Sequence, residues 1–549
     1  MKNKISNIVI VVFLGAALGS CAFFEMDLTK DPSELAPEDA NPDYALNAMQ
    51  ISFKDFLNDP DPANWKGVNK FGMEVVRMIN VWGATYEIAY NPTNFDEIWG
   101  LAYEGLLMDA NTFIPIYEEK EWYIHSGIAK VLQAYTLATL VDFFGDVPFS
   151  QSFDPTNFNP AVDDQQALYS LAINKLDSAI ADFGKDAKAA PSNDLFYNGD
   201  VTKWITLANT LKLKLYLNLK LIDKANATAE INQLIADGDL IDDPSEEFTF
   251  QYSTNNVNPD CRHPYFTYNY LNGANDYMAN YFMWALYGEK TNIDPRIRYF
   301  FFRQVLESSE SFQELPCYGS TAPSHYAPEM PYCTLDDGYW GRDHLNGDGI
   351  PPDTRKRTLF GVYPAGGQFD NNDGVSGSAG SGLQGAGAEV IMMAPYVKFM
   401  LAEAVLTLGT TGNAKTLLME GVQSSISSVM AFGASQANPL YVPTNAMITA
   451  YTDEVSTRYD NATTDEERLE VIAKEYYIAL FGNGVESYNL VRRTTYPSNL
   501  QPALLEAPGD FCRSFIYPAI CVNLNSSVKQ KTTGAVQVFW DTNPTGIIQ

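Results

Sequence analysis

Positive charge is scarce in this sequence. Lys and Arg together number 36, against 67 Asp and Glu, which gives a formal net charge of −31. A chain this acidic is repelled by phosphate backbones and by anionic lipid headgroups. Nucleic acid is therefore not expected as a partner, whereas neutral ligands remain open.

The sequence also lacks the motifs of zinc proteases and serine hydrolases. HExxH, CxxC and GxSxG are all absent, and the four histidines are not paired at the spacing of metal ligands on a helix. Gly380, Gly382 and Gly385 do spell GxGxxG. They stand in a Gly- and Ser-rich loop with no strand before them, so we interpret the motif as a flexible turn and not as a dinucleotide site.

No cofactor is expected from the remaining polar loops. Around Gly349 and Gly374 the acidic residues follow part of the EF-hand pattern, but His344 and Phe369 stand where the first calcium ligand belongs. Neither loop is therefore an EF-hand. Carbonyl-rich loops can still bind calcium, so a structural Ca²⁺ remains open.

Long apolar runs are missing apart from one near the start of the chain. Lys2 and Lys4 precede the apolar run 8–18, which is too short to span a bilayer comfortably and is followed by Leu-Gly-Ser-Cys21. This pattern predicts an export signal over residues 1–20, of the kind that ends in a bacterial lipobox. We expect Cys21 to carry the lipid and residues 21–41 to form a tether, so that the protein is anchored to a membrane without crossing it.

Cysteines are few, and five remain after Cys21, an odd number for an oxidising compartment. Cys512 and Cys521 flank a short segment with a proline that can bend back, and Cys317 and Cys333 flank a Pro- and Tyr-containing loop. We predict these two bridges, with Cys261 left over. The alternative, in which all five thiols are reduced and buried, stays open.

Helical periodicity is present at both ends of the chain. The apolar residues of 122–138 fall at spacings of three and four, so they line one stripe of a helix. Asp142 continues this stripe, and Gly145 and Pro148 end the helix. Asp200 is a predicted N-cap. Similar patterns predict helices over 43–57, 165–183, 201–221, 225–235, 396–408, 414–432 and 466–481.

The middle of the chain, residues 242–392, has a different texture. It is rich in Tyr, Asn, Pro and Gly, and only residues 275–286 predict a helix. The longest irregular run covers 339–382, and its interspersed aromatic residues favour an ordered structure. Runs of this length in a compact protein are usually functional or disordered.

Several strings resemble one family, the SusD/RagB nutrient-binding outer-membrane lipoproteins, and most closely its SusD-like branch. They are DFFGDVPFS from Asp142, GRDH from Gly341, GIPPD from Gly349, GVYPAGGQFD from Gly361, VKFMLAEA from Val397 and VFWDTNP from Val538. The resemblance implies a mainly α fold, a tetratricopeptide-like helical-repeat scaffold with a large loop-rich insertion and few short strands. In this reading 42–241 and 393–549 form the scaffold, and 242–392 forms the irregular, ligand-binding part of one SusD-like unit.

Two loops combine aromatic rings, which we expect to be exposed, with amides and charges. Sugar rings stack their C–H faces on Trp and Tyr while Asn, Asp and Arg meet the hydroxyls, and peptides use the same surfaces. We therefore predict ligand contact in these two loops, as sets, although packing within the irregular middle is the alternative for each ring. The candidates are Trp82, Tyr86, Tyr90, Asn91 and Asn94 in the first loop, and Tyr326, Tyr339, Trp340, Arg342 and Asp343 in the second.

The function predicted from the sequence is binding without catalysis. The resemblance implies a surface lipoprotein that binds nutrient oligomers, with oligosaccharides favoured and oligopeptides as the alternative. It also implies a TonB-dependent SusC-like transporter as partner, with this protein as its lid. A surface glycoside hydrolase with paired carboxylates is an alternative of another class, but no acidic pair is marked out by its surroundings. A purely structural assembly protein is a third interpretation.

Overall fold

The computed structural model describes residues 36–61, 65–271, 273, 275–307, 323–327, 337–347 and 355–546. The chain divides into two compact units, Met1–Asn41 and Pro42–Gln549. The described part of the first unit contains the short 3-10 helix η2 (Pro37–Asp39). The predicted lipid site Cys21 and the predicted bridge between Cys317 and Cys333 lie outside the described residues.

The first half of the larger unit is a set of helices packed around α7 (Tyr123–Phe144). The other members are α2 (Pro42–Leu57), α6 (Met108–Glu119), α8 (Gln165–Phe183), α9 (Val201–Leu219) and α10 (Lys224–Asp237). Because α2, α6, α8 and α9 all contact α7, every residue from His125 to Phe144 is buried. The sequence predicts a single apolar stripe for this helix, and that is too narrow. A helix that is apolar all round requires cover on every side.

Local sequence signals place these helices correctly. The helix predicted over 165–183 is α8, and Asp164 caps it by accepting a hydrogen bond from Ala167 N at 2.9 Å. Asp200 caps α9 as predicted, accepting from Thr202 N at 3.0 Å. Each cap satisfies a backbone N–H that the helix itself leaves unpaired.

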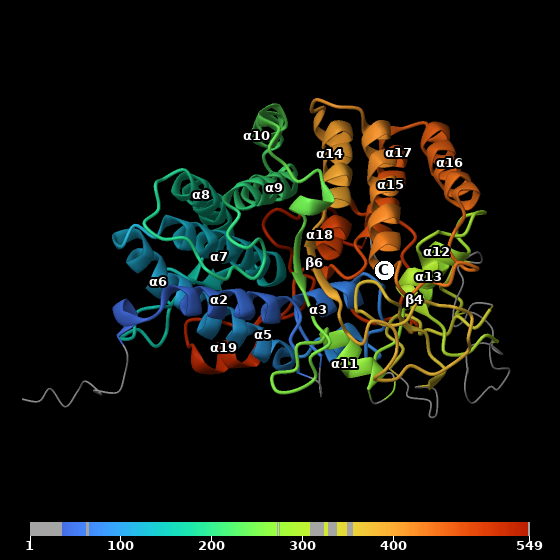
Figure 1. Cartoon of the computed structure of the whole chain (residues 1–549), viewed down its shortest axis with the longest axis horizontal. Coiled ribbons are helices and arrows are strands. Elements are labelled where there is room, and N and C mark those ends of the chain that lie inside the picture. The colour runs from blue at the N-terminus through green and yellow to red at the C-terminus, as the bar shows by residue number, and fades with distance from the viewer. Residues whose placement is uncertain are drawn as a thin grey trace, which may run out of the picture. The chain divides into compact units, whose positions relative to one another are not determined.

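The second half of the unit is a second set of helices, seen at the centre and right of Figure 1. They are α14 (Ala394–Leu408), α15 (Ala414–Gly433), α16 (Asn445–Asn461), α17 (Asp465–Ala479) and α18 (Gly484–Thr494). Gly409 ends α14 with φ 71°, and Gly482 follows α17 with φ 100°, so both act as the predicted stops. Neither α16 nor α18 is predicted from the sequence.

A buried ion triad joins the two sets of helices. Glu403 on α14 accepts hydrogen bonds from Lys220 Nζ, just after α9, at 2.6 Å and from Arg493 Nε on α18 at 2.7 Å. A second Arg493 nitrogen, Nη2, lies 3.0 Å from Glu403 Oε2. Burial alone would raise the pKa of Glu403, but the charges of Arg493 and Lys220 and their hydrogen bonds outweigh it and hold the pKa at about 2.

A short antiparallel sheet joins the beginning and the end of the irregular middle. β3 (Phe248–Gln251) pairs with β6 (Ala388–Met392), with Gln251 opposite Ala388. The middle also contains α11 (Pro264–Tyr270), α12 (Asn280–Tyr287), α13 (Ile297–Phe300), η5 (Pro244–Glu246) and the strand pair β4 (Phe301–Phe302) and β5 (Leu359–Phe360). The predicted helix near 275–286 corresponds to α12, and α11 is an addition to the prediction.

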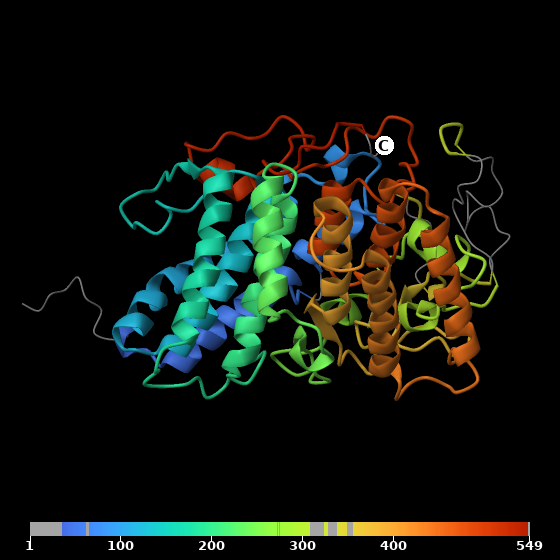
Figure 2. The same ribbon diagram turned by 90° about the horizontal axis from the view of Figure 1, so that it is seen from above.

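Short elements and a long closing segment, residues 495–546, complete the unit. The short elements are α3 (Val68–Val75), α4 (Tyr86–Ala89), η3 (Pro92–Phe95), α5 (Asp96–Gly100), the π-helical η4 (Leu101–Leu107), β1 (Val147–Pro148), β2 (Val162–Asp163) and α19 (Ala519–Leu524). Figure 2 shows the closing segment, in red, running along one side of both sets of helices. Its Phe515 N donates to Phe143 O on α7 at 2.7 Å. The fold is therefore mainly α, as predicted.

The predicted bridge between Cys512 and Cys521 is wrong, because both are free thiols and Cys261 is a third. The chain between Cys512 and Cys521 does not bend back on itself. Arg513 is fixed to Asp541, and Phe515 is fixed to α7, so the segment runs on to α19. Burial raises the pKa of each of the two buried thiols to about 12.

Candidate ligand-binding site

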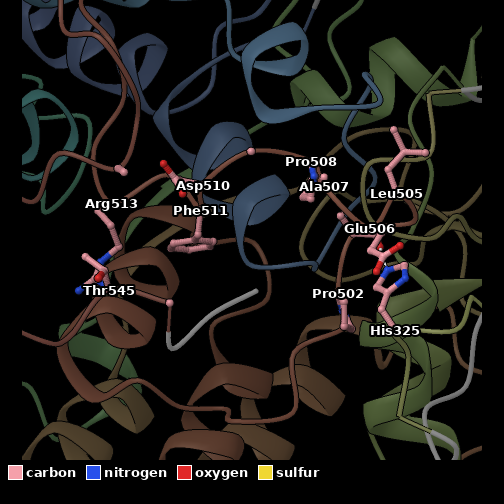
Figure 3. Close-up of a pocket in the computed structure, with 14 residues that line it drawn as sticks. His325, Pro502, Leu505, Glu506, Ala507, Pro508, Asp510, Phe511, Arg513 and Thr545 are labelled. Atoms are coloured by element: carbon pink, nitrogen blue, oxygen red, sulfur yellow. Dashed lines mark hydrogen bonds between the residues drawn. The ribbon is translucent and has the colours of Figure 1, made fainter.

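A cavity of about 790 Å³ opens beside the closing segment. Figure 3 shows its lining, which consists of His325 and of closing-segment residues: 502–503, 505–511, Arg513, Ala535 and 545–546. Ligand pockets in proteins commonly have volumes of 300–1,000 Å³ and combine apolar walls with a few polar groups. This cavity has both kinds of surface, since Leu505, Pro502 and Pro508 stand near Glu506 and Asp510.

Both loops singled out in the sequence lie directly behind this lining. From the first loop, Tyr86 N donates to Pro508 O at 3.0 Å. From the second loop, Tyr326 OH donates to Pro502 O at 3.1 Å, and His344 O accepts from Leu504 N at 2.9 Å. The closing segment is thus fastened across the two predicted loops and forms the surface that a ligand would meet.

A buried chain of polar groups fixes the floor of the cavity. Arg77 Nη2 donates to Tyr86 OH at 3.2 Å, and Tyr86 OH lies 3.0 Å from His344 Nε2. Burial and the charge of Arg77 lower the pKa of His344 well below its usual range, so this ring is neutral. The Arg77 guanidinium also lies 5.5 Å from the ring of Phe511, which lines the cavity and meets Tyr86 edge-on.

The two predicted loops also meet away from the cavity lining. The Arg342 guanidinium of the second loop lies 4.4 Å from the Trp82 ring of the first. Trp82 Nε1 donates to Asp276 Oδ1 at 3.1 Å, and Asp276 is paired with Lys70 at 2.9 Å. The two loops therefore lie close together, and ligand contact by them as sets stays a prediction.

Most of the ten candidate side chains are not exposed to solvent. Side chains of seven of the ten are buried, which contradicts the expectation that they are exposed: Tyr86, Tyr90, Tyr326, Tyr339, Trp340, Arg342 and Asp343. The closing segment covers four of them, Tyr86, Tyr90, Tyr326 and Asp343. Gln501 Nε2, for example, donates to Asp343 Oδ1 at 2.6 Å. The other three pack elsewhere: Tyr339 against Tyr287 and Arg303, Trp340 against Arg357, and Arg342 against Trp82.

The remaining three candidates, Trp82, Asn91 and Asn94, are partly exposed. Asn91 caps η3 by accepting from Thr93 N at 3.1 Å, and Asn94 Nδ2 donates to Ala89 O at 2.8 Å. Both amides therefore have structural partners. Contact between these three side chains and a ligand stays a prediction.

The segment that forms most of the lining is not predicted from the sequence as a ligand site. The string PALLEAPGDF from Pro502 to Phe511 carries two prolines, a glycine and two acids, which is an ordinary loop composition. Its only signal is the presence of Leu505 and Phe511 in a loop beside a cysteine. That signal does not distinguish a ligand site from a packed loop.

Metal and dinucleotide sites find little support in the described residues. There, no group of three or more His, Cys, Asp or Glu side chains is placed to hold a metal ion. Most of the loop around Gly349 lies outside the description. In the loop before Gly374, Asp370 is bound by Arg303 Nε at 2.5 Å. Gly382, in the GxGxxG string, has φ 56° and packs against the backbone of Gly367, which fits a structural turn.

Comparisons with known families and structures give consistent results. Residues 37–324 match the family model described as "Starch-binding associating with outer membrane", and residues 364–534 match "Susd and RagB outer membrane lipoprotein". No curated protein matches the sequence. Within the described residues, each helix is too short or too polar to cross a membrane.

The fold is shared with solved structures of low sequence identity. A SusD/RagB family protein from Bacteroides thetaiotaomicron is 18% identical, with a TM-score of 0.66, and the match covers 92% of this chain and 100% of that one. A chitin-binding SusD homologue from Flavobacterium johnsoniae is 19% identical, with a TM-score of 0.63, covering 91% and 99%. A further structure, named only as a chitin-binding protein, is 18% identical with a TM-score of 0.66, covering 92% and 100%.

Proposed function

Because this chain belongs to the SusD/RagB family of outer-membrane lipoproteins, we propose that it captures nutrient oligosaccharides at the cell surface and passes them to a transporter. The transporter is a TonB-dependent, SusC-like partner, over which the protein acts as a lid. Binding is followed by sequestration, and no covalent bond of the ligand changes.

The observation that carries this proposal is the cavity beside the closing segment. Its lining offers Leu505, which is 47% exposed, together with two prolines and the edge of Phe511. Such surfaces suit the apolar C–H faces of sugar rings, while Glu506, Asp510 and backbone groups suit hydroxyls. Two structural neighbours are themselves named for binding chitin, which supports a polysaccharide as the source of the ligand.

The structure also suggests how the site is kept in shape without a ligand. The closing segment is tied to both predicted loops by backbone hydrogen bonds, and Phe511 is held by Arg77 and Tyr86. A preformed surface loses little conformational entropy when an oligomer binds. Recognition then depends on the lining more than on rearrangement of the scaffold.

Calorimetry with the purified protein tests the binding step. Oligosaccharides made from glucose and from N-acetylglucosamine are titrated beside neutral oligopeptides of similar mass. Saturable binding of an oligosaccharide supports the proposal. Binding of peptides alone would move the function to peptide capture, and release of reducing sugar during the titration would indicate a glycoside hydrolase.

Anchoring through lipid is tested separately. We propose that Cys21 holds the protein at the outer membrane, facing the cell exterior. A Cys21→Ala protein should be lost from the outer membrane in cells that lack the transporter. Its continued recovery with that membrane would contradict a lipid anchor.

A further inference from the structure

The charged groups around the cavity are unevenly balanced. Glu506 and Asp510 are exposed and both line the cavity. Within the described residues, neither carboxylate forms an ion pair. Figure 3 shows Asp510 beside Phe511 and Glu506 beside His325, on opposite sides of the opening.

The one arginine in the lining is already engaged by other groups. Arg513 Nε donates to Asp541 Oδ2 at 2.6 Å, and Nη2 contacts the other oxygen of the same carboxylate. Nη1 donates to Pro544 O at 3.0 Å. Beneath the floor, Arg77 is fully buried and donates to Gln501 O and Val75 O. Both guanidinium groups are therefore committed to the protein, and the two exposed carboxylates dominate the charge that a ligand meets.

We propose that the cavity selects amine-bearing oligosaccharides, whose rings carry protonated amino groups, over neutral ones of the same length. The inference rests on the proposed function and specifies its ligand class. A chain of amino sugars offers apolar ring faces to Leu505, Pro502 and Pro508 and positive charges to Glu506 and Asp510.

A basic peptide carries the same charge but fits this arrangement less well. Its amines stand at the ends of flexible lysine side chains, and fixing such a chain costs up to about 2 kcal/mol of conformational entropy. An amino group attached directly to a sugar ring has no such cost. The rigid oligomer also brings its apolar faces and its charges into place together.

Calorimetry with the full protein at mildly acidic pH tests the inference, with two oligomers of equal length as probes. One is an N-acetylglucosamine oligomer, and the other is its deacetylated, amine-bearing form. We expect the amine-bearing oligomer to bind about fivefold more tightly, because two exposed charge pairs together provide a gain in affinity of this size. The preference should shrink as salt is added and disappear in the double variant Glu506→Gln and Asp510→Asn.

A matched control changes the same charge elsewhere. The double variant Glu466→Gln and Asp453→Asn alters two exposed acids that do not line the cavity, and it should keep the preference. Equal binding of both oligomers, a preference that survives Glu506→Gln and Asp510→Asn, or binding of a lysine oligopeptide in place of the amine-bearing sugar would overturn the inference. Equal binding of both sugars leaves the proposed function standing, whereas failure to bind any oligosaccharide overturns both.

Discussion

The indole N–H of Trp540 donates a hydrogen bond to Asp142 Oδ1 at 2.8 Å, across 398 residues of chain. The same carboxylate accepts from Tyr169 OH at 3.2 Å and, through Oδ2, from Asn489 Nδ2 at 2.7 Å. Asp142 lies in the last turn of the central helix α7, and Trp540 belongs to the closing segment. Two of the strings that resemble the family, DFFGDVPFS and VFWDTNP, are thus held together by one buried hydrogen-bond network.

Replacing Trp540 with Phe tests the contribution of the hydrogen bond between Trp540 and Asp142. The substitution keeps an aromatic ring but removes one donor from a buried carboxylate, so we expect a loss of about 1–3 kcal/mol in the free energy of unfolding. Trp340→Phe is the matched control, because Trp340 is equally buried and its indole nitrogen has no hydrogen-bond partner within the described residues. Denaturant unfolding of both variants gives the comparison. Equal losses would show that the hydrogen bond to Asp142 contributes nothing.

The triad of Glu403, Arg493 and Lys220 predicts a dependence of stability on pH. At neutral pH, Glu403→Gln leaves two buried cations uncompensated and should cost about 3 kcal/mol. The pKa of Glu403 falls from its ordinary 4.5 to about 2 on folding. Its contribution is therefore fully present above pH 4.5 and is lost as the pH falls toward 2.

Denaturant unfolding of the wild type and of Glu403→Gln at neutral and acidic pH measures this effect. The difference between them should be large at neutral pH and should shrink as the pH falls through this window. Glu420→Gln is the control, since Glu420 pairs with Lys398 at 3.6 Å on an exposed surface and should contribute little. A difference for Glu403→Gln that is the same at both pH values would contradict the account.

The free thiols predict a specific order of chemical reactivity. Cys261 is exposed, whereas burial raises the pKa of Cys512 and Cys521 to about 12, so few thiolates form there. Alkylation of the native protein should label Cys261 first and should label Cys512 and Cys521 only after unfolding. Peptide mass spectrometry under non-reducing conditions reads the result. Recovery of a peptide pair joined through Cys512 and Cys521 would restore the bridge predicted from the sequence.

Replacing an apolar side chain in the lining of the cavity should weaken ligand binding without lowering the stability of the protein. Leu505→Ser removes a half-exposed side chain that a ligand would cover, and about 1 kcal/mol, or roughly fivefold in affinity, should be lost. Leu524→Ser is the control, because Leu524 is more exposed, at 72%, and does not line the cavity. Calorimetry with the bound oligosaccharide compares them. The same affinity for both variants would place the ligand elsewhere.

Local signals predict most of the scaffold from the sequence. The helices α8 and α9 follow from apolar spacing, and α9 also follows from its predicted cap Asp200, which acts within one turn of chain. The helix α16 carries a fainter signal of the same kind, since its buried residues Tyr451, Val455 and Tyr459 are spaced by four. A single stripe on an otherwise polar segment is a pattern that the sequence analysis overlooks.

Features created by distant parts of the chain are not predictable in this way. The helix α18 buries Glu486, Arg492 and Arg493, which local sequence alone would place on the surface. They are buried because partners such as Lys214, 2.5 Å from Glu486, come from other helices. Likewise Tyr86 and Trp340 look like exposed loop aromatics, and their cover depends on long-range packing. Resemblance to a family supplies the fold here, but it does not show which side chains face a ligand.

The most direct test of the account is to isolate the native protein from its outer membrane and identify what accompanies it by mass spectrometry. We predict a TonB-dependent transporter together with a ladder of masses spaced by one hexose or hexosamine unit. A spread of peptide masses would contradict oligosaccharide capture, and recovery of the protein without any transporter would contradict its role as a lid.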